Sequence, residues 1–315
     1  MARDLAKLQQ QQIREILAIE NVYTRKLFLN YKIALDEIRV TLSKIYEKYA
    51  KAGALTYAEM SKFNRLDKLN AQLSDILGPT LSANGRLVED LRKVQYQESF
   101  YRHAWAIDQH AGVSLRWGLL NPKTIQAAVN APEWRKIKDI AVKTWRLDTY
   151  TKLDRTITQG LIQGQSYDKM ARALKENVLE KSASNAERIA RTEAHRATVQ
   201  GQLDLYSEAD SMGVNILRIW DATLDMATRP AHGELDGQAA DKDGMFHTSI
   251  GLVEGPGLSG DPSFDINCRC SVRPQVKDYE PKVRRIRDEG VQPYKTYKEW
   301  AKEKGIKVNK YGQKL

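Results

Sequence analysis

Apolar side chains recur every three or four positions through the first fifty residues, which is the spacing of one face of an α-helix. Residues 3–52 contain neither Gly nor Pro, so nothing in this stretch marks a turn. The pattern predicts one long helix or two consecutive helices. An unbroken helix of this length would exceed about 70 Å, so we expect either a break or an extended helical arm.

Helical periodicity continues through residues 57–150, where Gly and Pro interrupt it. The interruptions predict several helices in sequence, and they lie at Gly78-Pro79, Gly85, Gly112, Asn121-Pro122 and Ala131-Pro132. Gly160 and Gly164 interrupt a further helical stretch. Ser184 and Glu187 have the spacing of a capping box, which predicts another helix over about residues 186–213.

The pattern changes after this helix. The segment NILRIW is short, β-branched and alternating, and the residues that follow it are rich in Gly, Asp and Pro. We expect short strands over residues 216–220, near residues 245–247 and over residues 270–273. These strands would pack against the preceding helix in a small α+β module.

The composition is typical of a folded chain, because 42% of the residues are hydrophobic and 29% are charged. We predict a mainly α protein with an elongated helical N-terminal region over residues 1–155. A small Gly- and Asp-rich α+β module with short strands would follow over residues 156–274, and a basic C-terminal tail over residues 275–315. The sequence shows neither a signal peptide nor a run of roughly twenty apolar residues, which predicts a reducing cytoplasm and no membrane partner.

The charge balance favours a polyanionic partner, since 50 Lys and Arg stand against 40 Asp and Glu for a net charge of +10. Residues 277–315 hold twelve basic and six acidic side chains, so they supply six of these ten charges. One interpretation is non-specific contact with DNA phosphates, and the other is a tail that only keeps the protein soluble. The candidate DNA-contacting residues are Lys282, Arg284, Arg285, Arg287, Lys302, Lys304, Lys307 and Lys310.

Charged residues gather in two places that carry information on function. The first is the helix predicted after Ser184, which holds an Arg-Thr-Glu triplet. The second is the Gly-rich segment that follows, which has too few apolar residues for a large core, so polar cross-links or a metal must help to hold it. We predict a structural polar network formed by Arg188, Arg191, Glu193, Arg196, Asp221, Asp225, Arg229, His232 and Asn267.

Four motifs follow one another in this part of the chain. They are the Arg-Thr-Glu helix at residues 191–193, Trp220 before an Asp-x-x-Thr-Arg-x-x-His loop at residues 225–232, Leu-Asp-Gly at residues 235–237, and Asn-Cys-Arg-Cys at residues 267–270. In this order they resemble the phage Mu protein F-like head morphogenesis family. The resemblance covers roughly residues 156–274.

The resemblance implies a structural minor head protein, built in small numbers into the virion near the portal inside the head. Its implied role is in head assembly, DNA packaging and ejection. The implied partners are the portal protein, the major capsid or scaffolding protein, and packaged double-stranded DNA. No enzymatic reaction and no required cofactor are implied.

An enzyme is the alternative, either a metal-dependent nuclease or a toxin-like transferase acting on nucleic acid. Glu193, Asp221, Asp225, His232 and His247 offer acids and bases for such chemistry. However, the sequence shows no paired nucleophile and base, no phosphate-cradling glycine loop and no His-Glu-x-x-His motif. We therefore expect a protein that is not an enzyme.

Cys268 and Cys270 are the two cysteines of the chain, and with one residue between them they are poorly placed for a relaxed disulfide. We expect reduced thiols or metal ligands. A structural zinc site would combine the two thiolates with His232 and with His247 or Asp225.

In the metal-free alternative, Cys268 and Cys270 flank the turn into the last strand and bind no metal. In that case Arg269 and Arg229 would hydrogen-bond to Asp225 or Asp221 and hold the turn.

Overall fold

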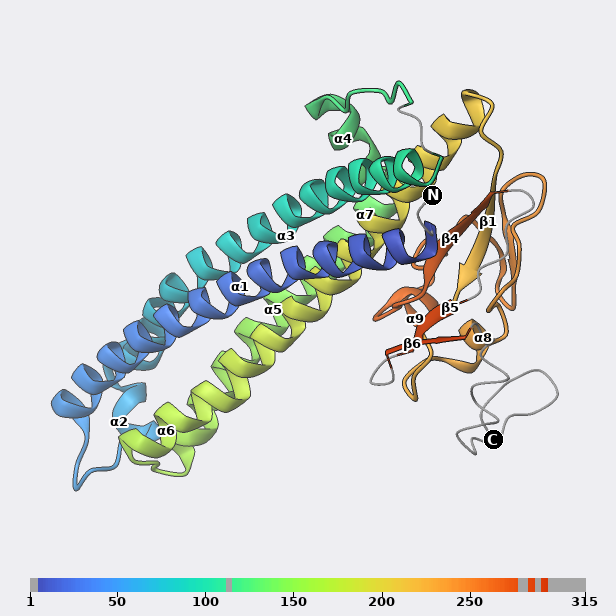
Figure 1. Cartoon of the computed structure of the whole chain (residues 1–315). Helices are drawn as coiled ribbons and strands as arrows, with labels where there is room; N and C mark the ends of the chain where they lie inside the picture. The colour runs from blue at the N-terminus through green and yellow to red at the C-terminus, as the bar shows by residue number, and fades with distance from the viewer. Residues whose placement is uncertain (1–4, 112–114, 277–282, 287–289, 294–315) are drawn as a thin grey trace. The chain divides into compact units, whose positions relative to one another are not determined.

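The computed structural model describes residues 5–111, 115–276, 283–286 and 290–293 (Figure 1). The helices are α1 (Leu5–Tyr49), α2 (Tyr57–Ser61), a 3-10 turn (Lys62–Asn64), α3 (Arg65–Ala111), α4 (Pro122–Val129), α5 (Pro132–Ile162), α6 (Tyr167–Leu174), a π-helical turn (Lys175–Glu180), α7 (Lys181–Ser211), α8 (Pro230–Gly233) and α9 (Pro262–Asp265). The strands are β1 (Ile216–Asp221), β2 (Phe246–Thr248), β3 (Gly251–Val253), β4 (Ser271–Val276), β5 (Val283–Ile286) and β6 (Gly290–Pro293). Among the described helices, none combines the length and the apolar character that crossing a membrane requires.

The fold class is the predicted one, mainly α with short strands in the last third of the described chain. The N-terminal pattern forms one unbroken helix of 45 residues. The three predicted strands are present as β1, β2 and β4, each displaced by at most a few residues. The sequence pattern therefore identified the N-terminal helix and these three strands, although their ends differ.

The predicted break at Gly78-Pro79 is wrong, because Pro79 lies inside the 47-residue helix α3. A proline inside a helix costs about 3 kcal/mol. Leu73, Leu77 and Leu81 are completely buried on this helix, and burying one such side chain contributes about 1.5–3 kcal/mol. Burial of the leucine face therefore outweighs the local preference of proline.

The capping box at Ser184 is also wrong. Ser184 lies within α7 and its hydroxyl donates to the carbonyl of Glu180, one turn earlier. The chain passes from α6 through a π-helical turn directly into α7. Gly164 does end the preceding helical segment, with φ at +60°, whereas Gly160 remains inside α5.

The described chain divides into two compact units. A helical unit contains Asn21–Leu91 and Arg135–Ala190, and a sheet unit contains the residues up to Glu20, Arg92–Trp134 and the chain from Arg191 onward. The long helices contribute residues to both units, so each unit is assembled from separate stretches of sequence. The continuous ranges expected from the sequence therefore differ from the boundaries of the compact units.

The helical unit has a core of mainly aliphatic side chains, to which α1, α3, α5, α6 and α7 contribute. Buried polar groups within it bond to one another. The Ser182 hydroxyl lies 2.8 Å from the Tyr31 hydroxyl and 2.7 Å from the Thr149 hydroxyl, and the Trp145 indole N–H donates to it at 2.9 Å. These bonds leave the four side chains satisfied inside the core.

The sheet unit is built on antiparallel pairing of β1 with β4, from Ile216 opposite Val276 to Asp221 opposite Ser271 (Figure 1). Two smaller antiparallel pairs are β2 with β3 and β5 with β6. Trp220 is fully buried in the core, which also includes residues of α3 and α7. The sheet unit therefore places the loops that follow β1 and precede β4 next to α7.

Candidate functional site

A buried chain of charges connects α3, α7 and the loop before β4 in the sheet unit. Glu193 accepts from Arg196 at 2.9 Å and lies 3.0 Å from the guanidinium of Arg92. Arg196 also reaches Asp265, at 3.3 Å, and donates to the carbonyl of Gly257 at 3.0 Å. All four charged side chains are at most 4% exposed. Each buried charge therefore has an opposite charge as a partner, as burial requires.

Asp265 adds hydrogen bonds from its own loop. It accepts from the backbone N–H of Ser259 at 3.1 Å, the Ser259 hydroxyl at 2.7 Å and the N–H of Gly260 at 2.9 Å. A carboxylate with a guanidinium and three further donors fixes the loop against α7. Asp265 therefore fixes the position of the loop that leads into the Asn-Cys-Arg-Cys segment.

A second ion pair joins the loop after β1 to the turn before β4. Both nitrogens of the Arg269 fork donate to Asp225, one of them at 2.8 Å. Asp225 also accepts from the N–H of Ala227 at 2.9 Å and from the Thr228 hydroxyl at 3.3 Å. Burial alone would raise the pKa of Asp225, but the bonds from Arg269, Ala227 and Thr228 outweigh it and lower that pKa.

Arg229 binds backbone carbonyls rather than a carboxylate. Its guanidinium donates to the carbonyls of Phe264 and Ile266. The prediction that Arg229 pairs with Asp225 or Asp221 is therefore wrong, whereas the predicted pair of Arg269 with Asp225 is present. The fork of Arg229 instead satisfies the carbonyl groups at the end of the short helix α9.

The remaining residues of the expected network lie outside this buried chain of charges. Arg188 is exposed and belongs to the helical unit, and Arg191 is largely exposed with its guanidinium 3.2 Å from Glu20. Asp221 accepts from Ser271 at 3.4 Å across the β1–β4 pair. Asn267 adopts the left-handed region, with φ at +58°, which permits the turn before β4.

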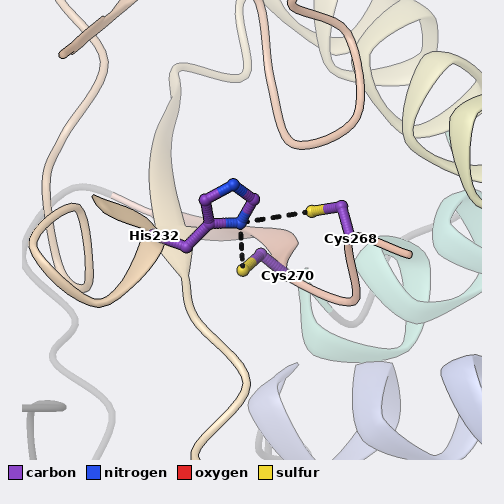
Figure 2. A group of neighbouring side chains, drawn as sticks. All are labelled: His232, Cys268 and Cys270. Atoms are coloured by element: carbon purple, nitrogen blue, oxygen red, sulfur yellow. Dashed lines mark hydrogen bonds between the residues drawn. The ribbon is translucent and has the colours of Figure 1, made fainter. Parts of the chain in front are cut away.

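A compact cluster of His232, Cys268 and Cys270 lies between α8 and the start of β4 (Figure 2). Nδ1 of His232 is 3.6 Å from the sulfur of Cys268 and 3.5 Å from that of Cys270. The side chains are 2–3% exposed. The hydrogen bond between the two thiols raises the pKa of Cys268 and lowers that of Cys270.

The two proposed fourth ligands are placed elsewhere. His247 is on β2, its side chain is 67% exposed, and its Nε2 lies 2.9 Å from Asp241. Asp225 is occupied by Arg269. The predicted ligand set is therefore wrong in its fourth member. His247 is exposed and bonded to Asp241, so it does not belong to the buried cluster.

Comparison with known proteins assigns the chain to a family. The family described as "Phage Mu protein F like protein" matches residues 151–273. The minor head protein GP7 of Bacillus phage SPP1 is 30% identical over 298 residues, which covers 91% of this chain and 95% of that protein. The chain belongs to this family of phage minor head proteins. No solved structure matches the chain.

A second relative of this chain is named as an enzyme. The NAD(+)--arginine ADP-ribosyltransferase EFV of Enterococcus faecalis (strain ATCC 700802 / V583) is 30% identical over 276 residues. The match covers 87% of this chain but only 56% of that longer protein. Nearly half of the relative therefore has no counterpart in the aligned region.

Two members of the buried charge network were not predicted. Asp265 precedes the family's closing Asn-Cys-Arg-Cys motif, so its position in the sequence was a usable signal. Arg92 lies outside the matched residues 151–273 and within a helical pattern like any other, so its sequence context gave no signal. Only the approach of α3 to α7 reveals its role.

His195 is a further residue that the sequence did not single out. Burial lowers its pKa to about 4, and the charges of Arg196 and His232 act in the same direction. It is therefore neutral at physiological pH.

Most of the candidate DNA-contacting residues lie outside the part of the chain that the structure describes. Lys282, Arg287, Lys302, Lys304, Lys307 and Lys310 lie outside the described residues, and Arg284 and Arg285 belong to β5. DNA contact through the basic tail stays a prediction.

Proposed function

We propose that this minor head protein is a structural component of the head interior near the portal vertex. Its partners would be the portal protein, the major capsid or scaffolding protein, and packaged double-stranded DNA. The observation that carries the proposal is the match to a minor head protein over 95% of that protein's length. A correspondence over almost the whole length supports a shared structural task rather than a single borrowed module.

The buried charges support a structural role. Glu193, Asp265 and Asp225 each bind an arginine. A general acid or base must change its protonation state near the working pH, whereas the bonds from Arg269, Ala227 and Thr228 lower the pKa of Asp225. These side chains are suited to holding loops in place.

The basic tail supports contact with packaged DNA. Residues 277–315 carry twelve basic and six acidic side chains. Binding through such residues releases counterions from the phosphates and is independent of base sequence. A role in packaging or ejection would follow from this contact, because both processes move DNA past the portal.

Cryo-electron microscopy of heads from the parent phage, with symmetry relaxed around the portal vertex, tests the proposed location. We expect density for the α1, α3, α5 and α7 helices beside the portal or on the inner face of the shell. Purified heads that lack the chain by mass spectrometry as well as by imaging would contradict a virion component.

An enzymatic role is the second candidate, and the relative named as an ADP-ribosyltransferase is the observation that favours it. Incubation with labelled NAD⁺ and an arginine-rich acceptor protein would detect transfer, and incubation of DNA with Mg²⁺, Mn²⁺ or Zn²⁺ would detect a nuclease. We expect neither reaction. Transfer or cleavage that is retained through purification and elutes with the folded chain in size-exclusion chromatography would establish an enzyme instead.

A further inference from the structure

The cluster of His232, Cys268 and Cys270 brings three metal-binding atoms to one point (Figure 2). Their ligand atoms all lie within 4.8 Å of one another. The histidine comes from α8 and the cysteines from the turn before β4, so the cluster joins two segments far apart in the sequence. Both sulfurs face the same nitrogen, Nδ1.

The spacing of these atoms fits one tetrahedral metal ion. Zinc binds histidine nitrogen at about 2.0–2.1 Å and cysteine sulfur at about 2.3 Å, so a tetrahedral angle separates the two ligand atoms by about 3.6 Å. The observed separations are 3.6 Å to Cys268 and 3.5 Å to Cys270. Thiolate and imidazole ligands select zinc over the oxygen-binding ions magnesium and calcium.

The surroundings hold the imidazole so that Nδ1 is the ligating atom. The ring packs edge-on to Trp220 at 5.9 Å and tilted against Phe264 at 4.2 Å, measured between ring centroids. Nε2 is buried and has no hydrogen-bond partner among the described residues. Nδ1, which faces the two sulfurs, is therefore the ring nitrogen available to bind a metal.

We propose that His232 Nδ1, Cys268 Sγ and Cys270 Sγ bind one structural zinc ion that ties α8 to the start of β4. Three protein ligands leave one tetrahedral position for a water molecule. With side chains only 2–3% exposed, the ion stabilises the fold and does not meet a substrate. This inference does not depend on the proposed function.

Metal analysis of the full chain, expressed without a polyhistidine tag in zinc-supplemented medium, tests the site. We expect about one zinc per chain after dialysis, and less than about a tenth of that in His232→Ala and in Cys270→Ser. His247→Asn is the matched control, because it removes an exposed histidine outside the cluster, and it should keep the wild-type zinc content. A folded wild type without zinc, or a His232→Ala variant with full zinc, would overturn the proposal.

Cobalt substitution gives a readout that does not depend on folding of the variants. Wild type reconstituted with Co²⁺ should show thiolate-to-metal charge-transfer absorption and the visible bands of tetrahedral cobalt. His247→Asn should give the same spectrum, and a chelator should abolish it and lower the melting temperature. A wild-type spectrum without charge-transfer absorption would also overturn the site.

Discussion

Arg196 and Asp265 are 69 residues apart in the sequence, yet Nη2 of Arg196 lies 3.3 Å from Oδ2 of Asp265, with both side chains almost fully buried. Arg196 also binds Glu193 one turn earlier on α7. One guanidinium thus neutralises two carboxylates from different segments. The loop before β4 depends on this arginine for its position.

Replacing Arg196 by alanine should be strongly destabilising. The change leaves Glu193 and Asp265 with one charge partner fewer inside the sheet unit, and breaking a buried ion pair typically costs about 3–5 kcal/mol. Urea denaturation of the variant measures the loss. The matched control is Arg39→Ala, which removes an exposed arginine 3.8 Å from Asp36 and should change stability by about 0–1 kcal/mol. Equal effects of the two variants would show that the buried network is not a stabilising feature.

The Asp225–Arg269 pair predicts a stability difference that depends on pH. The folded-state pKa of Asp225 is below its ordinary value of 3.8, so its stabilising effect is fully present above that value. The effect is lost as pH falls through the folded-state pKa. Wild type should therefore exceed Asp225→Asn in stability at pH 7, and the difference should shrink below pH 4. Denaturation curves at pH 7, 5, 4 and 3 measure it, and a difference independent of pH would contradict the ion pair.

The buried His103 should make the protein less stable in mildly acidic solution, because its pKa is lowered. Burial lowers its pKa to about 4; its Nδ1 donates to the Ser99 carbonyl at 2.7 Å and its Nε2 accepts from Gln202 at 2.8 Å. Between its unfolded pKa of about 6.5 and 4, only the unfolded state is protonated, so stability falls with decreasing pH by up to about 1.4 kcal/mol per unit. His103→Gln should make this dependence less steep. An unchanged slope in chemical denaturation between pH 6.5 and 4.5 would contradict a neutral buried histidine.

Two helical glycines should respond oppositely to alanine. At Gly201 on α7 an added Cβ would lie 2.5 Å from the backbone oxygen of Tyr96 on α3, so Gly201→Ala must push the helices apart. We expect a loss of about 1–3 kcal/mol. Gly85, inside α3, has open space around it, so Gly85→Ala should raise stability by up to about 1 kcal/mol. Melting temperatures compare the two, and a stabilising Gly201→Ala would disprove the close approach.

Deleting residues 277–315 should weaken binding to double-stranded DNA. The wild-type affinity should fall steeply as salt increases, with a slope of about 0.9 per phosphate contacted on logarithmic axes, and the deletion should flatten this dependence. Fluorescence anisotropy with two unrelated DNA sequences measures both effects. A full-length variant with the eight candidate basic residues changed to glutamine separates charge from length. If deletion and wild type bind alike, the tail serves another purpose.

The sequence predicted most of the elements because apolar spacing is a local property. The helices and three strands were recognised from it, and the Asp225–Arg269 pair was among the alternatives. The sequence-based prediction failed at Pro79, where burial of the leucine face of α3 outweighs the local preference of proline. It also failed at Ser184, which lies inside α7, and at the fourth zinc ligand, because His247 is exposed on β2.

The sequence by itself determined the fold class, the family and the residue types of the site, since periodicity and motif order are written along the chain. Only the tertiary structure decided which of those residues meet. It paired Glu193 with Arg92 of α3, joined His232 to the two cysteines and left His247 exposed. The physical reason is that a buried charge or thiol is stabilised by whichever partner the packing of helices and loops brings within bonding distance, and that distance is not encoded in local spacing.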